Sequence, residues 1–278
     1  MSQLFNAFLF KIKRDLTFRI TLFIGIGLAI FMTLLFVLLE QITKTKMLSG
    51  ELMLVTSLNP AQNFGLAIPV NLITFTVLEF NQGSIRNKII AGHSKAKVYT
   101  SLFLNGLIFA FSLIIVYSLL CFALGSLIGG VEGGGMAMSL VGASYAKEYI
   151  YKIIIVGIFT YLSITSFTIF FSTLFRSIGP AIPVVIVTIV FLSLVGTLVG
   201  TLGGSEELVW ILRIIDPLYG LGAAEVASST SIVDGVEVVT YYQDLTIETF
   251  VSSIISNLVY TALFFVLGIS IFKKRDIK

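Results

Sequence analysis

The chain has 278 residues, of which 56% are hydrophobic and only 12% charged, and its formal net charge is +3. Soluble domains carry about 25% charged residues, so this composition excludes a soluble protein and indicates an integral membrane protein surrounded by a lipid bilayer. A single cysteine, Cys121, excludes an intrachain disulfide, and one histidine with one cysteine argues against a zinc site. We expect no metal and no nucleic-acid partner.

The first 19 residues predict an amphipathic helix that lies in the membrane interface. Its apolar face carries Leu4, Phe5, Phe8 and Ile12, and its basic face carries Lys11, Lys13 and Arg14. Such a helix turns its basic side toward anionic lipid. An overhang of the first span is the alternative. No cleavage pattern of small residues follows, so we expect the next apolar run to be a retained first span.

Six apolar stretches qualify as transmembrane helices, which need about 20 residues each. They are residues 20–39, 64–80, 99–128, 149–175, 178–202 and 247–272, which together form a transmembrane domain over 20–272. The runs are apolar on all faces rather than alternating, so an all-α fold is expected and a β-barrel is not.

The charges between the spans alternate in sign. Net charges are +3 over residues 1–20, 0 over 40–63, +4 over 81–98, −1 over 129–148, +1 at Arg176, −7 over 203–248 and +3 over the tail 273–278. Basic loops stay on the cytoplasmic side. The pattern therefore predicts six crossings with both termini inside the cell.

The second and third spans are joined by a cytoplasmic loop over residues 81–98 that contains a short amphipathic helix. Ile85 and Ile89 are four residues apart, Arg86 points elsewhere, and Gly92 is expected to end the first part of the loop. Charge alone is equally consistent with a positive-inside anchor and with a contact to a partner.

The order of residues in and around this loop resembles the intracellular loop of type-2 ABC exporter permeases. That family often shows a Glu, then Gly-Thr or Gly-Ser, a basic residue, Gly-Ser-Arg or Gly-Ser-Lys, and a Tyr that opens the third span. The matching residues are Glu79, Gly83-Ser84-Ile85-Arg86-Asn87-Lys88, Gly92-His93-Ser94-Lys95 and Lys97-Val98-Tyr99. Ser84 stands where Thr is common, and Lys95 where Arg is common. The likeness extends to the whole plan of the chain.

The resemblance implies that the loop is a coupling helix seated in a groove of a cytosolic ATPase, which would bind ATP and Mg. Closure of two ATPases would push the loop and tilt the attached spans. Glu79 would lie at the membrane face and pair with a basic residue of the loop, or else form a simple interfacial cap. The N-terminal helix would be an elbow that also touches the ATPase. The residues assigned to the ATPase contact are Glu79, Gly83, Ser84, Arg86, Asn87, Lys88, Gly92, His93 and Lys95.

The chain itself carries no nucleotide-binding motif. The pattern G-x-x-x-x-G-K-[ST] is absent, and the glycines between Gly129 and Gly135 follow a span and precede no strand. We therefore expect no catalytic residue and no cofactor bound by this chain. His93 is expected to be a cytosol-facing contact residue and Cys121 a packing residue.

Polar and small residues mark particular faces of the later spans. The fourth span has a polar stripe of Thr160, Ser163, Ser166 or Thr168, Ser172 and Thr173, which serves either helix packing or substrate contact. The fifth span has Pro183 near its start, and Gly196, Gly200 and Gly204, each four apart, predict close helix packing.

In related permeases the second and fifth spans line the central path. The residues expected on that path are Pro69, Asn71, Thr74, Thr188, Phe191 and Val195. The span interiors contain essentially no charge, since Lys152 lies near an outer end. This argues against an ion-driven carrier.

The outer segment, residues 203–246, is expected to hold a short or re-entrant helix followed by a small hairpin. Leu208, Ile211, Leu212 and Ile215 follow helical spacing. Asp234-Gly235 is a turn sequence between valine-rich stretches. The acidity of this segment would suit a cationic cargo, or would have no function.

These observations predict the permease subunit of an ATP-driven exporter in the bacterial plasma membrane. It would pair with a second copy or a sister permease and with cytosolic ABC ATPase subunits. It would move an amphipathic or lipophilic cargo (a peptide, antibiotic or drug) out of the cell by alternating access. The alternatives are a non-transporting membrane scaffold or immunity protein, and an ATP-independent carrier.

Overall fold

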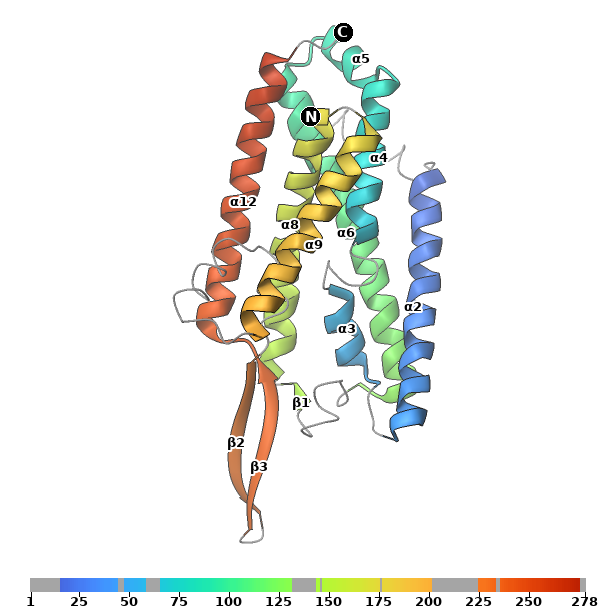
Figure 1. The fold of residues 1–278 in the computed structure, drawn as a ribbon. Helices are drawn as coiled ribbons and strands as arrows, with labels where there is room; N and C mark the ends of the chain where they lie inside the picture. Colours follow the sequence, from blue (N-terminus) through green and yellow to red (C-terminus); the bar gives the residue numbers. More distant parts are fainter. Residues whose placement is uncertain are drawn as a thin grey trace.

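The computed structural model describes residues 16–44, 48–58, 66–131, 144–145, 147–175, 177–201, 225–233 and 236–275. These residues form a bundle of long helices with a β-hairpin projecting from one end (Figure 1). The helices are α2 (Leu16–Thr43), α3 (Gly50–Leu58), α4 (Ala67–Asn81), α5 (Ser84–Ile90), α6 (Lys95–Gly129), α8 (Lys147–Phe175), α9 (Ile178–Thr201) and α12 (Ile247–Lys274). The two ends of the bundle are called here the α5 end and the hairpin end.

Helices occupy all six stretches that were predicted as spans. Four of them are long and apolar enough to cross a membrane: Leu16–Thr43, Lys95–Gly129, Glu148–Phe175 and Ile247–Lys274. The protein is therefore embedded in a membrane and crosses it several times. The apolar helices over Ala67–Asn81 and Ile178–Leu192 are shorter than these four. Six membrane crossings therefore stay a prediction.

The region of the predicted second crossing contains two helices, α3 and α4, instead of one. The sequence treats residues 40–63 as a connection, but the structure contains α3 there, packed against α6 and α8. Gly50 N donates a hydrogen bond to Gly130 O at the hairpin end of α6, and Phe75 of α4 stacks on Phe109 nearer its α5 end. Thus α3 and α4 follow each other along α6 (Figure 1). Two short helices together cover the length that one span was expected to cover.

Glycines on α6 allow α3 to pack this closely. A Cβ added at Gly125 would lie 2.7 Å from Ser49 O and 2.8 Å from Met53 Cγ, and one at Gly129 would lie 2.1 Å from Leu48 O. The approach of α3 therefore requires glycine at these two positions. Ser49 Oγ accepts from Leu52 N at 3.1 Å, which satisfies one free amide at the start of α3.

The predicted hairpin in the outer segment is confirmed. Strands β2 (Glu225–Val233) and β3 (Val236–Asp244) pair antiparallel from Glu225↔Asp244 to Val233↔Val236. The two-residue strand β1 (Ser144–Tyr145) pairs parallel to β3. The predicted turn residues 234–235 and the short or re-entrant helix expected around Leu208–Ile215 lie outside the described residues. So do residues 1–15 of the N-terminal helix predicted over 1–19, while residues 16–19 belong to α2.

Helices α6 and α8 together form the centre of the bundle. They pack against each other, α3, α4, α9 and α12 pack against α8, and α2, α3, α4, α5 and α12 pack against α6. A large apolar cluster joins α2, α3, α4, α6 and α8, and a smaller one joins α4, α8 and α9. A third cluster, around Tyr99 and Phe272, lies at the α5 end. Helix α2 lies at the periphery and exposes Phe23, Phe31 and Leu38, among other apolar residues. Exposed apolar side chains on a membrane helix contact lipid.

Candidate functional site

Helix α5 forms a compact cap where α4 and α6 meet. Gly83 and Gly92 bracket it with φ angles of +67° and +89°, which residues with a Cβ rarely adopt. The predicted end of the first part of this loop at Gly92 is thereby confirmed. Ile85 is completely buried in the apolar cluster with Tyr99 and Phe272. One face of α5 is therefore fixed to the bundle.

Glu79, in the last turn of α4, is the buried charge that holds α5 in place. Its side chain is nearly inaccessible, and its Oε2 accepts hydrogen bonds from Ser84 Oγ at 2.7 Å and Lys88 Nζ at 2.8 Å. A buried carboxylate is tolerated only with such partners. The predicted pairing of Glu79 with a basic residue of the loop is confirmed, and the partner is Lys88.

The opposite face of α5 is exposed and combines a charge with apolar surface. Arg86 and Asn87 are exposed, and Ile90 is 71% exposed although it is a large apolar residue. Gly92 is also exposed, and His93 is half-buried. A short helix with one fixed face and one mixed apolar and basic face has the composition of a protein contact surface.

At the α5 end, a cluster that we call the tail clamp joins Lys95 at the start of α6 to Arg275 just after α12. Lys95 Nζ donates to Arg275 O at 2.8 Å and Lys273 O at 3.2 Å. The Arg275 guanidinium donates to Thr173 O at 2.9 Å and to Leu174 O in the last turn of α8. Such carbonyls lack partners inside their own helix.

The tail clamp therefore ties the ends of three helices together. Lys95 was among the predicted site residues, whereas Arg275 was predicted only as part of a basic tail. Its role depends on α8 and α12 ending side by side, and no local pattern in the sequence reports that arrangement.

A polar seam runs between α8 and α12 inside the bundle. Asn257 is fully buried; its Oδ1 accepts from Ser163 Oγ at 2.6 Å, and its Nδ2 donates to Thr160 Oγ1 at 3.3 Å. Ser166 Oγ donates to Thr261 O at 3.0 Å. Thr160, Ser163 and Ser166 thus serve helix packing, as one interpretation of the stripe predicted, and Ser163 also lines a cavity between α9 and α12. Asn257 had no assigned role in the sequence, although a lone amide in an apolar span was a usable signal.

Ser172 and Thr173, at the α5 end of the stripe, form side-chain hydrogen bonds within α8. Ser172 Oγ donates to Thr168 O at 2.6 Å and Thr173 Oγ1 to Phe170 O at 2.8 Å. Side chains that return to their own helix backbone stabilise no contact between helices by that bond.

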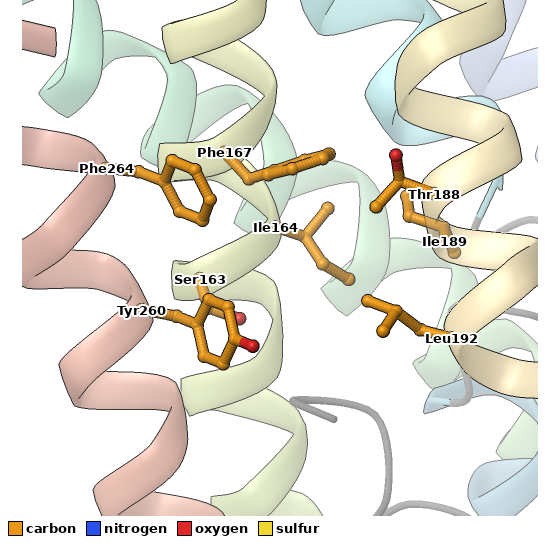
Figure 2. A pocket seen from close by; sticks show the side chains of 8 residues that line it. All are labelled: Ser163, Ile164, Phe167, Thr188, Ile189, Leu192, Tyr260 and Phe264. Atoms are coloured by element: carbon orange, nitrogen blue, oxygen red, sulfur yellow. The ribbon is translucent and has the colours of Figure 1, made fainter. Parts of the chain in front are cut away.

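A cavity of about 180 Å³ opens between α9 and α12, with α8 forming its third side. We call it the α9–α12 cleft. Figure 2 shows Tyr260 and Phe264 reaching into it from α12, and Thr188, Ile189 and Leu192 from α9. Its lining is completed by Ser163, Ile164 and Phe167 of α8. None of the described residues that line the cleft is charged. It is an aromatic space with three hydroxyl groups.

The six residues predicted on a transport path do not gather around one cavity in the described part of the chain. Thr188 lines the α9–α12 cleft. Asn71 instead accepts from Thr21 Oγ1 of α2 at 2.7 Å. Phe191 is 62% exposed. The others are buried Pro69, half-buried Thr74 and half-buried Val195. Gly196 and Gly200 lie near the end of α9, Gly204 lies outside the described residues, and their predicted packing stays a prediction.

Comparisons with known proteins give no relative from which a role could be transferred. No protein-family model matches the chain, and neither does a curated protein or a solved structure. Within the described ranges there is also no group of three His, Cys, Asp or Glu residues placed to hold a metal ion. Any functional assignment therefore depends on the sequence motif and on the geometry given above.

Proposed function

We propose that the chain is the membrane-spanning permease subunit of an ATP-driven ABC exporter. The observation that carries this proposal is the construction of α5. Its inner face is fixed by buried Ile85 and by the Glu79–Lys88 ion pair, while its outer face presents Arg86 and Ile90. A rigidly mounted helix with an unburied apolar and basic face suits a contact that transmits force from a soluble partner.

The distribution of charge supports a cytoplasmic position for this face. Lys88, Lys95 and Arg275 lie together at the α5 end. Glu51 and Glu148 begin the helices α3 and α8 at the hairpin end, which also carries the acidic hairpin. Basic segments remain in the cytoplasm, so a cytosolic partner would reach α5. With α3 and α4 counted as one crossing, six crossings return the chain to this side.

The contacts at the α5 end supply a route from the partner to the membrane helices. A displacement of α5 acts on α4 through Glu79 and on α6 through the short turn at Gly92. The tail clamp then connects the start of α6 to α8 and α12. Because this chain has no nucleotide-binding motif, the ATP and Mg would be bound by the separate ATPase. Its closure would shift the helices between two arrangements and move a lipophilic or amphipathic cargo outward.

Site-specific crosslinking tests the proposal. A photoreactive amino acid is placed at Asn87 on the exposed face of α5, and at exposed Thr246 beside the hairpin as the matched control. Each variant is co-expressed with a candidate soluble ABC ATPase from the same organism. We expect crosslinks to the ATPase from position 87 only, and ATP hydrolysis by the purified complex. A complex that hydrolyses ATP but crosslinks only from position 246 contradicts the proposal, and so does export of cargo by the chain without any ATPase.

A further inference from the structure

The α9–α12 cleft has a volume that suits one aromatic ring. Helices α9 and α12 both pack on α8, which forms the floor between them. The cavity of about 180 Å³ slightly exceeds the roughly 150 Å³ that accommodates benzene in an engineered apolar cavity. Its volume therefore limits the occupant to a group of about one aromatic ring, even when the rest of a ligand extends beyond the opening.

The walls of the cleft favour an aromatic occupant. Phe167 and Phe264 form an edge-to-face pair with centroids 5.0 Å apart, and Tyr260 stacks on Phe264 at 6.0 Å. Figure 2 shows these rings around the open space, with the hydroxyl end of Tyr260 directed into it. Aromatic pairs in these arrangements gain energy beyond the area they bury. Among the residues that the structure describes, none of those lining the cleft is charged, and an uncompensated charge at membrane depth is expensive, so the cleft favours a neutral occupant.

The hydroxyl groups of the lining define the polar part of the occupant. Thr188 Oγ1 donates its only hydrogen to Val184 O at 2.7 Å. Ser163 Oγ lies 2.6 Å from Asn257 Oδ1 and 2.8 Å from Thr160 O, both of which are acceptors. Each hydroxyl has one hydrogen and two lone pairs, so both are left with acceptor capacity. The third hydroxyl, of Tyr260, can donate as well as accept. The Ser163 and Thr188 hydroxyls, whose single hydrogens are already engaged, are complemented by a hydrogen-bond donor on the ligand.

We propose that the α9–α12 cleft binds a phenol-like group: a neutral aromatic ring that carries a hydrogen-bond donor. The ligand reaches the cleft from the membrane, because half-buried Thr188, Leu192 and Phe264 form its rim next to exposed Val187 and Phe191. Taken together with the proposed function, which this extension assumes, the group belongs to the exported cargo. The binding itself requires neither ATP nor the ATPase.

Photolabelling of the purified full chain tests the proposal without reference to transport. The protein is placed in phosphatidylcholine nanodiscs and labelled with a phenol that carries a diazirine, and the labelled peptides are identified by mass spectrometry. We expect labelling on the α9 and α12 peptides that contain Leu192 and Tyr260. Unlabelled phenol should compete about tenfold better than toluene, which has a similar ring but no donor, as one hydrogen bond would give.

Two variants with matched controls make the result specific. Leu192→Trp fills the cleft and should reduce labelling at least fivefold, whereas Leu194→Trp, on the exposed opposite side of α9, should not. Thr188→Val keeps the size of the side chain but removes an acceptor, and should abolish most of the preference for phenol over toluene. Melting temperatures of all variants identify any that fail to fold.

Three outcomes overturn the inference. The first is equal competition by phenol and toluene, the second is labelling unaffected by Leu192→Trp, and the third is labelling confined to other helices. Binding observed here together with an absence of ATPase crosslinking at Asn87 would instead contradict the proposed function alone. The two experiments can therefore fail independently.

Discussion

Lys95 and Arg275 are 180 positions apart in the sequence, yet the ammonium group of Lys95 donates a hydrogen bond of 2.8 Å to the backbone carbonyl of Arg275. The guanidinium group of Arg275 in turn donates to two carbonyls in the last turn of α8. Each cation thus neutralises the negative end of a helix at the α5 end. The start of α6, the end of α8 and the end of α12 are consequently joined through two side chains.

Arg275→Ala should loosen this junction. It removes two charge-assisted hydrogen bonds and leaves Thr173 O and Leu174 O without these donors, so we expect a loss of about 1–3 kcal/mol. The melting temperature in detergent can be followed with a thiol-reactive dye, because the only cysteine, Cys121, is buried until the bundle opens. Lys274→Ala, at an exposed neighbour, is the control. Equal melting temperatures for the two variants would show that the Arg275 side chain contributes nothing to stability.

Replacement of Lys88 should separate stability from partner contact at α5. Lys88→Ala removes a cation that pairs with the buried carboxylate of Glu79, which we expect to cost about 1–3 kcal/mol because Lys88 retains some exposure. Glu79→Gln in the same background should recover part of this loss, since it removes the buried negative charge. Arg86→Ala, on the exposed face, should leave the melting temperature unchanged and weaken ATPase binding. The reverse pattern, with Arg86 affecting stability and Lys88 not, would contradict the arrangement.

Asn257 should be the most sensitive polar residue of the α8–α12 seam. Asn257→Ala removes its contacts to Thr160 and Ser163 at once, and membrane helix hydrogen bonds of this kind contribute about 0.6–1.7 kcal/mol each. We expect a lower melting temperature, measured with the same dye. Ser270→Ala is the control on α12. Ser270 is exposed, and its hydroxyl donates to Val266 O of the same helix. If Asn257→Ala leaves the melting temperature unchanged, the hydrogen bonds of the seam are dispensable for stability.

The close packing of α3 on α6 gives a prediction about glycine. Gly125→Leu would drive a side chain into Ser49 and Met53, and overpacking of this kind costs about 1–3 kcal/mol. Gly27→Leu on α2 is the matched control, because a Cβ there meets nothing within 4 Å. Thermal unfolding should distinguish the two variants. If both variants unfold at the same temperature, α3 does not pack against α6 as described.

Hydrophobicity and charge predicted the positions of the long helices because both are local properties of the chain. Helix α3 was missed since its nine residues are too few for a span, and its packing depends on Gly125 and Gly129, some 70 residues later. The hairpin was predictable from Asp234-Gly235 and the valine-rich stretches around it. The succession of α3 and α4 along α6 was not, because it depends on packing between parts of the chain that are distant in sequence.

The site residues divide along the same line. The pairing of Glu79 was predictable, since its partner Lys88 is nine residues away and the motif places both near one turn. The role of Asn257 and of Arg275 was not, because each acts on α8 from about 100 positions away. The path residues were assigned from a resemblance to a family, and the described structure gathers only Thr188 into a cavity. A single sequence does not show which helices will be neighbours, so contacts between helices that are distant in the chain could not be predicted.

The orientation of the bundle can be determined with single cysteines. Asn87→Cys on α5 and Thr246→Cys beside α12 are both at exposed positions, and the native Cys121 is buried and should contribute little background. In intact cells, a membrane-impermeant maleimide should label position 246 and not position 87, because the basic α5 end is expected to face the cytoplasm. Permeabilised cells should show labelling at both positions, which controls for access. If position 87 is labelled in intact cells, α5 faces the exterior, and a cytosolic ATPase cannot reach it.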